Sequence, residues 1–329
     1  MIRSGVTCCS DLYFFPEAAA EGLREAGLRC ATAGIVIGFP SAWAANDDEY
    51  ISKCEALIER YSGDPFVRVT VGPHAPYTVS DASLARCAAL SERHDLPVHI
   101  HVNETAGEVE TSLKDHGERP VARLARLGLL NERLISVHSV HTSNEDIRML
   151  AEARASVCHC PSSNLKLASG FAPVAKMMKA GINLGIGTDG AASNDKLDML
   201  GETRLAAMLA KAVAGATTCA KVFDMLEAAT LGGARALHWD DEIGSLEIGK
   251  CADMIAVDLS GIECLVDPGY EPPAAAWRSG DTMEMPRVEG KAAPKQKEFR
   301  APDPREKKHG RGRVVAIVIV LLVAAAAAA

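Results

Sequence analysis

The sequence predicts an α/β fold in which seven parallel strands alternate with helices, nearly a full (β/α)8 barrel. Short unbroken apolar runs, typical of strands covered on both faces, alternate with amphipathic helical patterns from about residue 5 to 237. A (β/α)8 barrel repeats this unit eight times. The alternative is an open doubly wound sheet, which usually carries a glycine-rich phosphate loop after its first strand, and the sequence shows none there.

The predicted elements alternate in order along this region. The strands are expected at residues 5–9, 29–38, 66–73, 96–103, 133–140, 155–161 and 182–190. The helices are expected at 16–27, 48–63, 80–95, 104–117, 143–154, 172–181 and along the stretch 196–237. Two short strand-like runs then surround the turn Ile248-Gly249-Lys250, and we interpret them as a hairpin-like addition outside the barrel.

The C-terminal region has a different composition. From about Glu263 it is rich in Pro, Gly, Lys and Arg, so we expect 263–329 to be largely disordered. Its last part, Val314 to Ala329, is apolar but shorter than the roughly 20 residues of a membrane-spanning helix. We interpret this part as a non-native extension, such as one from a shifted reading frame. A tail anchor that contacts a membrane is the alternative.

Charge and cysteine usage limit the classes of function. The net charge of -8 argues against a nucleic-acid partner. The ten cysteines show no framework spacing, and the first residues lack the long apolar stretch of a secretory signal. We therefore expect reduced, mostly buried thiols in a cytoplasmic protein.

Polar side chains are concentrated where the five later strands end. These residues are His74, then His99, His101 and Glu104, then His138, then His159 and Asn164, and finally Asp189. A barrel carries its chemistry at the carboxyl ends of its strands. A single histidine in a strand is more often a hydrogen-bonded core residue than a ligand. Burying the whole set together would be costly without a shared partner, and a divalent cation is the simplest one. Imidazole and carboxylate suit zinc, and also iron or manganese.

The segment "HIHVNE" illustrates how these residues divide. His99 and His101 point to the same face of a strand, because alternate residues do so. His101 is nearer the rim and is the predicted ligand, whereas His99 lies deeper and is expected to be a hydrogen-bonded core residue. Asp189 can ligate the ion and take a proton from its water, and His138 can orient that water. The set predicts metal-assisted hydrolysis.

Several long segments resemble a known family. They are "VGPHAPYTVSD", "HIHVNETAGEVE", "SVHSV", "HCPSSNLKLASGFAPV" and "LGIGTDGAASNDKLDMLGE". They are similar to the amidohydrolase superfamily, in particular to its 5-methylthioadenosine/S-adenosylhomocysteine deaminase branch, near the chlorohydrolase-type enzymes. The resemblance runs from about Met1 to Gly261 and implies zinc-dependent hydrolytic deamination of an adenine nucleoside to its inosyl product, with release of ammonia.

The resemblance also implies residue roles. His101 and Asp189 would be metal ligands, and Asp189 would also shuttle a proton and contact the substrate. Glu104 would hold and protonate the ring nitrogen beside the attacked carbon, and His138 would act on the attacking water. His74 would contact the substrate. Asn164 and Lys166 belong to a motif that shapes the pocket floor. A homo-oligomer is expected by analogy.

One departure from the family pattern is large. The family's first barrel strand carries a His-x-His pair of zinc ligands, and this sequence begins with what resembles the second strand. The resemblance therefore implies an incomplete barrel over 1–240, a remnant of a small β-sandwich over 241–262, and the atypical tail. We expect the 329-residue chain to behave as a fragment that holds little zinc. Two alternatives are a related guanine deaminase or chlorohydrolase, and a catalytically inactive barrel that serves as a binding module.

Overall fold

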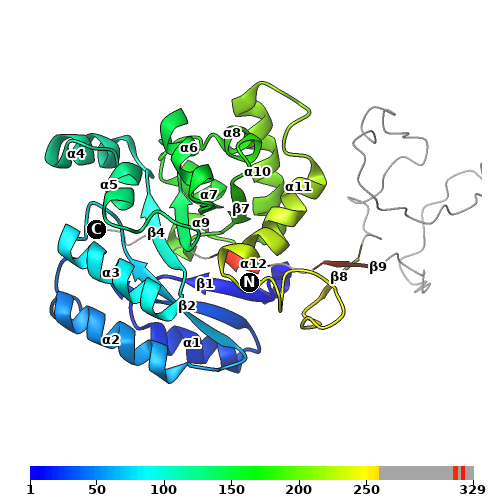
Figure 1. The fold of residues 1–329 in the computed structure, drawn as a ribbon. Coiled ribbons are helices and arrows are strands. Elements are labelled where there is room, and N and C mark those ends of the chain that lie inside the picture. The colour runs from blue at the N-terminus through cyan, green and yellow to red at the C-terminus, as the bar shows by residue number, and fades with distance from the viewer. Residues whose placement is uncertain (259–313, 318–319, 323–329) are drawn as a thin grey trace, which may run out of the picture. The chain divides into compact units, whose positions relative to one another are not determined.

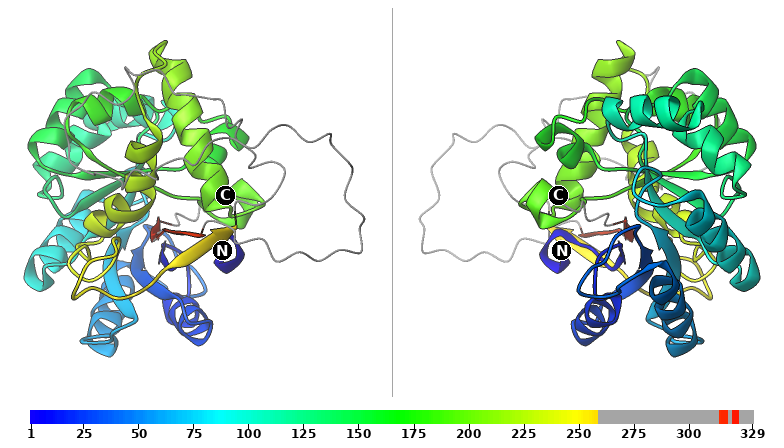
Figure 2. Two further views of the ribbon diagram at one scale, coloured as in Figure 1. Left: turned by 90° about the vertical axis from the view of Figure 1, so that its right-hand side faces the viewer. Right: turned by 90° about the vertical axis from the view of Figure 1, so that its left-hand side faces the viewer.

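The computed structural model describes residues 1–258 together with the backbone of 314–317 and 320–322. Seven parallel strands run in sequence order through one sheet, which curls into an incomplete barrel with helices on its outside (Figures 1 and 2). They are β1 (Cys8–Asp11), β2 (Arg29–Val36), β3 (Val67–Pro73), β4 (Val98–Val102), β5 (Leu134–His138), β6 (Ser156–His159) and β7 (Asn183–Ile186). All seven lie within the predicted strands or within two residues of them, which confirms the predicted α/β class.

Helices lie in every predicted helical range, but the structure adds three short ones that the pattern does not predict and divides the predicted stretch 196–237. They are α1 (Pro16–Glu25), α2 (Asp47–Arg60), α3 (Asp81–His94), α4 (Ala106–His116), α5 (Pro120–Arg126), α6 (Asn144–Glu152), α7 (Pro161–Lys166), α8 (Val174–Lys179), α9 (Ala191–Asn194), α10 (Met199–Ala214), α11 (Val222–Glu227) and α12 (Gly233–Ala236). A short 3-10 turn (Ile2–Ser4) begins the chain, and a π-helical segment (Ala228–Gly232) joins α11 to α12.

Polar side chains fix where several helices begin. Asn46, Ser80 and Thr105 each accept a hydrogen bond from the backbone N–H three residues later, at the starts of α2, α3 and α4. Ser143 forms a reciprocal capping box with Asp146 at the start of α6. Such caps satisfy N–H groups that a helix leaves free in its first turn. Each helix therefore starts at a defined distance from the strand before it, and this fixes the loops at the rim.

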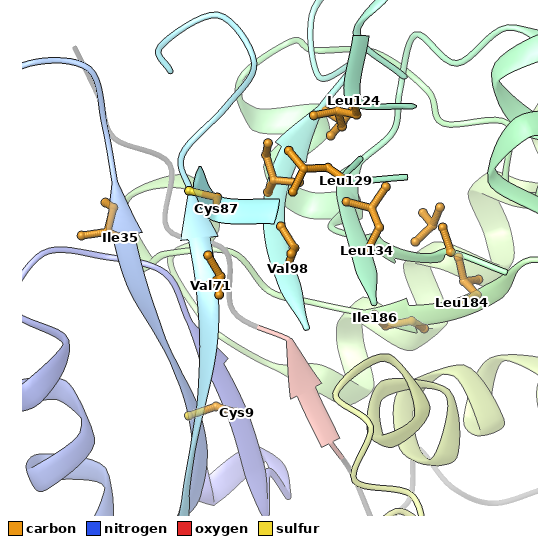
Figure 3. Close-up of a cluster of buried hydrophobic side chains, with 14 of the residues drawn as sticks. Cys9, Ile35, Val71, Cys87, Val98, Leu124, Leu129, Leu134, Leu184 and Ile186 are labelled. Carbon is orange, nitrogen blue, oxygen red and sulfur yellow. The ribbon is translucent and has the colours of Figure 1, made fainter. Parts of the chain in front are cut away.

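The apolar side chains between the sheet and the helices form the core (Figure 3). Leu134 at the start of β5 is completely buried in this cluster. Val98 lies directly opposite it on β4. These contacts hold the central strands, and with them the rim, in register.

Truncating Leu134 tests this part of the core. We expect Leu134→Ala to lower the free energy of unfolding by about 3 kcal/mol, because it removes buried methyl groups and leaves a cavity. Leu113→Ala on α4 is the control, since Leu113 is 45% exposed, and should change stability by less than about 0.5 kcal/mol. Urea unfolding of both variants measures the difference. Equal losses would contradict the assignment of Leu134 to the core.

The C-terminal tail contributes an eighth strand to the sheet. Strand β10 (Val320–Leu322) runs parallel to β1, with Cys8 opposite Val320 and Ser10 opposite Leu322. It also contacts β7, so it lies between the first and last strands of the series. The predicted disorder of 263–329 therefore does not extend to the backbone of this strand, and elsewhere in the tail it stays a prediction. The tail residues 263–313, 318–319 and 323–329 lie outside the described residues. No helix in the described part of the chain is long and apolar enough to cross a membrane.

The predicted hairpin around Ile248 does not form. Only its second run becomes a strand, β8 (Ile255–Asp258), and this strand pairs with β9 (Val314–Ile317) rather than with the first run. The residues before it form successive turns, with positive φ angles of 92° at Gly244 and 100° at Gly249. Glycine readily adopts such angles, which break an extended run. The second run therefore finds its partner far away in the sequence.

Candidate active site

The predicted site residues lie at the carboxyl ends of neighbouring strands. His74 follows β3, His101 lies near the end of β4, His138 ends β5, and Asp189 follows β7. The backbone N–H of His101 donates to the carbonyl of His74 at 3.1 Å, so these two strand ends are joined directly. The strand pattern therefore brings side chains from separate segments to one rim, as the sequence predicts.

Three imidazole rings form a compact cluster at this rim. The ring centroids of His74 and His101 are 5.1 Å apart, and those of His101 and His138 are 5.4 Å apart in a stacked arrangement. All three side chains are buried. His101 and His138 are thus close enough to act on a common bound group.

Hydrogen bonds set the tautomers of His101 and His138. His101 Nδ1 lies 2.7 Å from the backbone carbonyl of His74, and His138 Nδ1 lies 2.8 Å from Asn164 Oδ1. Both oxygens only accept, so each Nδ1 carries the proton and each Nε2 presents a lone pair. Both Nε2 atoms are buried and have no hydrogen-bond partner within the described residues. This tautomer suits a metal ligand or a base.

Burial favours the neutral form of the His74 and His101 imidazoles. It lowers the pKa of His74 to about 3, and the neighbouring His101 adds to this effect. Burial and the adjacent His138 also lower the pKa of His101, although its hydrogen bond to His74 and the carboxylates of Glu104 and Asp189 oppose the change. Neutral imidazole is the form that can bind a cation through nitrogen.

Glu104 reaches the cluster from the loop after β4. Its Oε2 atom lies 3.8 Å from His138 Nε2, and its Oε1 atom accepts a bond of 3.3 Å from the Ser169 hydroxyl. The side chain of Glu104 is 13% exposed. A carboxyl group that is accessible from one side and faces an imidazole can exchange protons with a bound molecule.

Asp189 is held rigidly after β7. Its carboxylate accepts from Ser163 Oγ at 2.5 Å, from Ser193 Oγ at 3.0 Å and from the Gly190 N–H at 2.6 Å. The Asp189 carboxylate opposes part of the lowering of the His101 pKa. Sequence reasoning did not identify Ser163 and Ser193, although both lie in the motifs that drew attention to Asn164 and Asp189.

The backbone at three strand ends adopts the left-handed conformation. The φ angles are 55° at Asn103, 68° at His138 and 59° at Asp189. Such angles cost a non-glycine residue about 1 kcal/mol or more and are one of the strained features that occur at active sites as well as in turns. Two of these residues, His138 and Asp189, are predicted site residues, and Asn103 directly precedes a third, Glu104.

The remaining histidines and Lys166 lie apart from this cluster or deeper in the barrel. His99 is completely buried and shares a hydrogen bond of 3.1 Å between its Nδ1 atom and Ser10 Oγ, which confirms its predicted place in the core. His159 is also buried, and neither ring nitrogen has a partner in the part of the chain that the structure describes. Lys166 is partly exposed and pairs with Asp195 at 2.6 Å.

The donors fit part of a metal site. His101 Nε2 is buried, unpartnered and in the correct tautomer, and Asp189 supplies a buried carboxylate. Within residues 1–258, however, no three His, Cys, Asp or Glu side chains lie close enough together to hold an ion. Stable zinc sites generally have at least three protein ligands. His101 and Asp189 would therefore need further metal ligands from outside the described residues to hold a zinc ion.

A separate cavity lies at the opposite ends of the strands. Its volume is about 710 Å³, and Thr70, Arg68 and Trp239 are among its lining residues. The Arg68 guanidinium stacks 4.6 Å above the Trp239 ring and pairs with Glu242 at 2.8 Å. These contacts tie the segment after α12 to the sheet.

The fold and the rim together define an α/β-barrel protein with an acid–base cluster at the carboxyl ends of its strands. More specifically, the chain belongs to the amidohydrolase family, which matches residues 1–293. A 5-methylthioadenosine/S-adenosylhomocysteine deaminase of Teredinibacter turnerae is 45% identical over 272 residues, which are 83% of this chain and 61% of that protein.

Two solved structures are similar in fold and sequence. One is an adenosine deaminase from Xanthomonas campestris with bound zinc, 47% identical, with a TM-score of 0.79 over 82% of this chain and 61% of that one. The other is an atrazine chlorohydrolase from Arthrobacter aurescens TC1 complexed with zinc, 26% identical, with a TM-score of 0.74 over 83% and 64%. The chain spans about three fifths of the length of the first relatives it matches.

Proposed function

We propose that this chain carries the acid–base part of a hydrolytic deaminase for adenine nucleosides. The substrate would be 5'-methylthioadenosine or S-adenosylhomocysteine, and the products would be the inosyl compound and ammonia. The observation that carries the proposal is the placement of Glu104 Oε2 3.8 Å from His138 Nε2, beside the unpartnered Nε2 of His101. The name of the Teredinibacter turnerae relative supports the substrate class.

Each residue has a defined part in this reaction. Water adds to the ring carbon that bears the amino group, ammonia leaves, and a carbonyl group remains. Glu104 donates a proton to the adjacent ring nitrogen and holds it, and His138 accepts a hydrogen bond from the attacking water at Nε2. Asp189 accepts the proton that the water gives up and passes it to the departing amino group, which leaves as ammonia. The remaining hydroxyl proton returns to Glu104 as the carbonyl forms. His74 contacts the substrate. These are ordinary general acid–base roles.

Zinc is the proposed ion, with His101 and Asp189 as two of its ligands. The bound zinc named for the Xanthomonas campestris deaminase supports this choice, although iron or manganese would suit the same donors. When bound, a divalent ion would lower the pKa of a coordinated water toward about 7. The His74 carbonyl would hold His101 in the ligating tautomer.

Two other functions remain as alternatives. The likeness to an atrazine chlorohydrolase favours hydrolysis of a different bond on a nitrogen heterocycle, and guanine would be another candidate substrate. An inactive binding module is favoured by the lack of a three-donor metal group in the described residues. The oriented set of Glu104, His138 and Asp189 counts against this second alternative, because binding alone would not need it.

Zinc content and ammonia release test the proposal. The 329-residue chain should hold substoichiometric zinc and release negligible ammonia from 5'-methylthioadenosine, because its described residues do not complete a ligand set. A chimera that adds the parts of the Teredinibacter turnerae relative lying outside the matched region should bind zinc stoichiometrically and turn over. Metal analysis and a coupled ammonia assay give both readings.

His101→Ala in the chimera is the matched control. It should lose zinc and turnover together, since it removes the ligand that this chain supplies. Turnover that survives the substitution would contradict the proposed site. Full zinc and rapid turnover by the 329-residue chain alone would show that its own residues complete the site. A panel with guanine and atrazine distinguishes the related hydrolases.

A further inference from the structure

We propose that Glu108 is a positioning residue, whose carboxylate fixes the turn that aims Glu104 at His138. The inference rests on the proposed function, in which Glu104 handles a proton. Glu108 does not touch the imidazole cluster in any described contact, so it would act through the backbone of Glu104 rather than on the substrate.

The carboxylate of Glu108 binds the turn between β4 and α4 at two points. Its Oε1 atom accepts from the Asn103 N–H at 2.9 Å, and its Oε2 atom accepts from the Glu104 N–H at 2.7 Å. Asn103 adopts a left-handed φ of 55°. A bond on each side of this strained residue opposes its relaxation to an extended conformation. The direction in which Glu104 leaves the turn is thereby fixed.

This arrangement differs from an ordinary helix cap. Thr105 is the N-cap of α4, and its hydroxyl accepts from the Glu108 N–H at 3.1 Å. In a capping box, the glutamate at this position returns to the N–H of the N-cap residue itself. Here both carboxylate oxygens reach back to the residues before the N-cap. The helix start is satisfied by Thr105, and the Glu108 side chain is used for the loop that carries the site residue.

Burial makes these two bonds important for Glu108 itself. Only 5% of the residue is exposed, and burial raises the pKa of its carboxyl to about 7, against the lowering effect of the backbone N–H groups. A buried carboxylate is costly unless donors compensate it. Glu110, two residues later on the same helix, is exposed. Burial of a glutamate is therefore specific to Glu108 and is not a general property of the glutamates on α4.

The side chain of Glu104 is held less firmly than its backbone. Its own contacts are a hydrogen bond of 3.3 Å from Ser169 and the approach of 3.8 Å to His138. Both are long compared with the 2.7 Å bond from the Glu104 N–H to Glu108. The position of the Glu104 carboxylate therefore depends mainly on where its backbone is anchored.

Hydrogen exchange and NMR of the 329-residue chain test the inference without metal or turnover. Glu108→Ala should raise amide exchange at Asn103 and Glu104 by about tenfold, as expected for the loss of one hydrogen bond at each. The amide of Ile100 within β4 should stay protected. Glu110→Gln is the matched control and should change none of these rates. If the alanine variant does not fold, Glu108→Gln replaces it. Glutamine keeps the volume and one acceptor oxygen, so exchange should rise at only one of the two amides.

The ring signal of His138 distinguishes positioning from general support. Glu108→Ala should move it in the same direction as Glu104→Gln, because both remove a carboxylate from beside Nε2, and the double variant should move it no further than Glu104→Gln alone. Unchanged exchange at both amides, an unmoved His138 signal or additive shifts would each overturn the inference. The chimera assay decides the proposed function separately, so either idea can fail without the other.

Discussion

Replacing Glu104 by glutamine in the zinc-loaded chimera is expected to lower kcat for ammonia release by about a thousandfold. KM for 5'-methylthioadenosine should change little. Glutamine has nearly the same shape as glutamate and can still form a hydrogen bond to a ring nitrogen, but it cannot deliver a proton. The loss should therefore appear in the chemical step, and steady-state kinetics with a coupled ammonia assay measure it.

The surroundings of Glu104 explain why the effect should be so large. Within the described residues, it is the carboxylate that lies beside the His138 imidazole, with Oε2 3.8 Å from Nε2. Glu108 is occupied by two backbone N–H groups, and Asp189 by two serine hydroxyls and a backbone N–H. Neither can replace Glu104 without breaking these bonds. A second acid is therefore not available to take over its role.

Glu110→Gln on the same helix provides the comparison for this variant as well. It removes one negative charge from an exposed position and should leave kcat and KM unchanged. A Glu104→Gln chimera that keeps kcat within tenfold of the unsubstituted one would be inconsistent with proton transfer by Glu104. Zinc content should stay the same in both variants, since neither side chain is a proposed ligand.

The sequence was sufficient to predict the central part of the fold and the rim. Apolar runs of four to eight residues locate β1 to β7, because a parallel strand buried on both faces needs an unbroken apolar stretch. Because the strands are parallel, their carboxyl ends lie at one edge of the sheet. His101 and His138 are therefore neighbours simply because they lie at the carboxyl ends of two adjacent strands. This is why a pattern of single histidines at successive strand ends is informative.

Features that depend on contacts between distant segments could not be read in the same way. The tautomer of His101 follows from the His74 carbonyl, whose position depends on how β3 and β4 pair. The pairing of β10 with β1 joins residues more than 300 positions apart, and no local pattern specifies it. The expected hairpin failed for a related reason, since β8 pairs with β9 instead of its neighbour.

Mild acid is expected to destabilise the chain through its buried histidines. Burial lowers the pKa values of His74, His99 and His159 to about 3, and neighbouring imidazoles contribute to each shift. In the unfolded chain a histidine binds a proton below about pH 6.5. Between about pH 6.5 and 3 the unfolded state therefore binds more protons than the folded state, and stability falls as the pH falls.

The size of this effect follows from the shifts. One such histidine should lower the free energy of unfolding by about 2 kcal/mol between pH 6.5 and 5. Three independent ones would remove about 6 kcal/mol, which is comparable with the whole stability of a typical domain. The raised pKa values of Glu108, about 7, and Asp11, about 6, act in the opposite direction, because the folded state binds these protons at a higher pH than the unfolded state does. We therefore expect urea unfolding at pH 7.5 and pH 5.0 to show a net loss of about 2 kcal/mol in the metal-free 329-residue chain.

His159→Leu separates this cause from general acid sensitivity. His159 is buried, and neither of its ring nitrogens has a partner within the described residues, so leucine removes a titrating group without breaking a described hydrogen bond. The loss of stability between pH 7.5 and 5.0 should shrink by about 2 kcal/mol. His94→Gln, at an exposed position, should keep the full loss. If His159→Leu lost as much stability as the unsubstituted chain, acid sensitivity would have to arise from groups other than this imidazole.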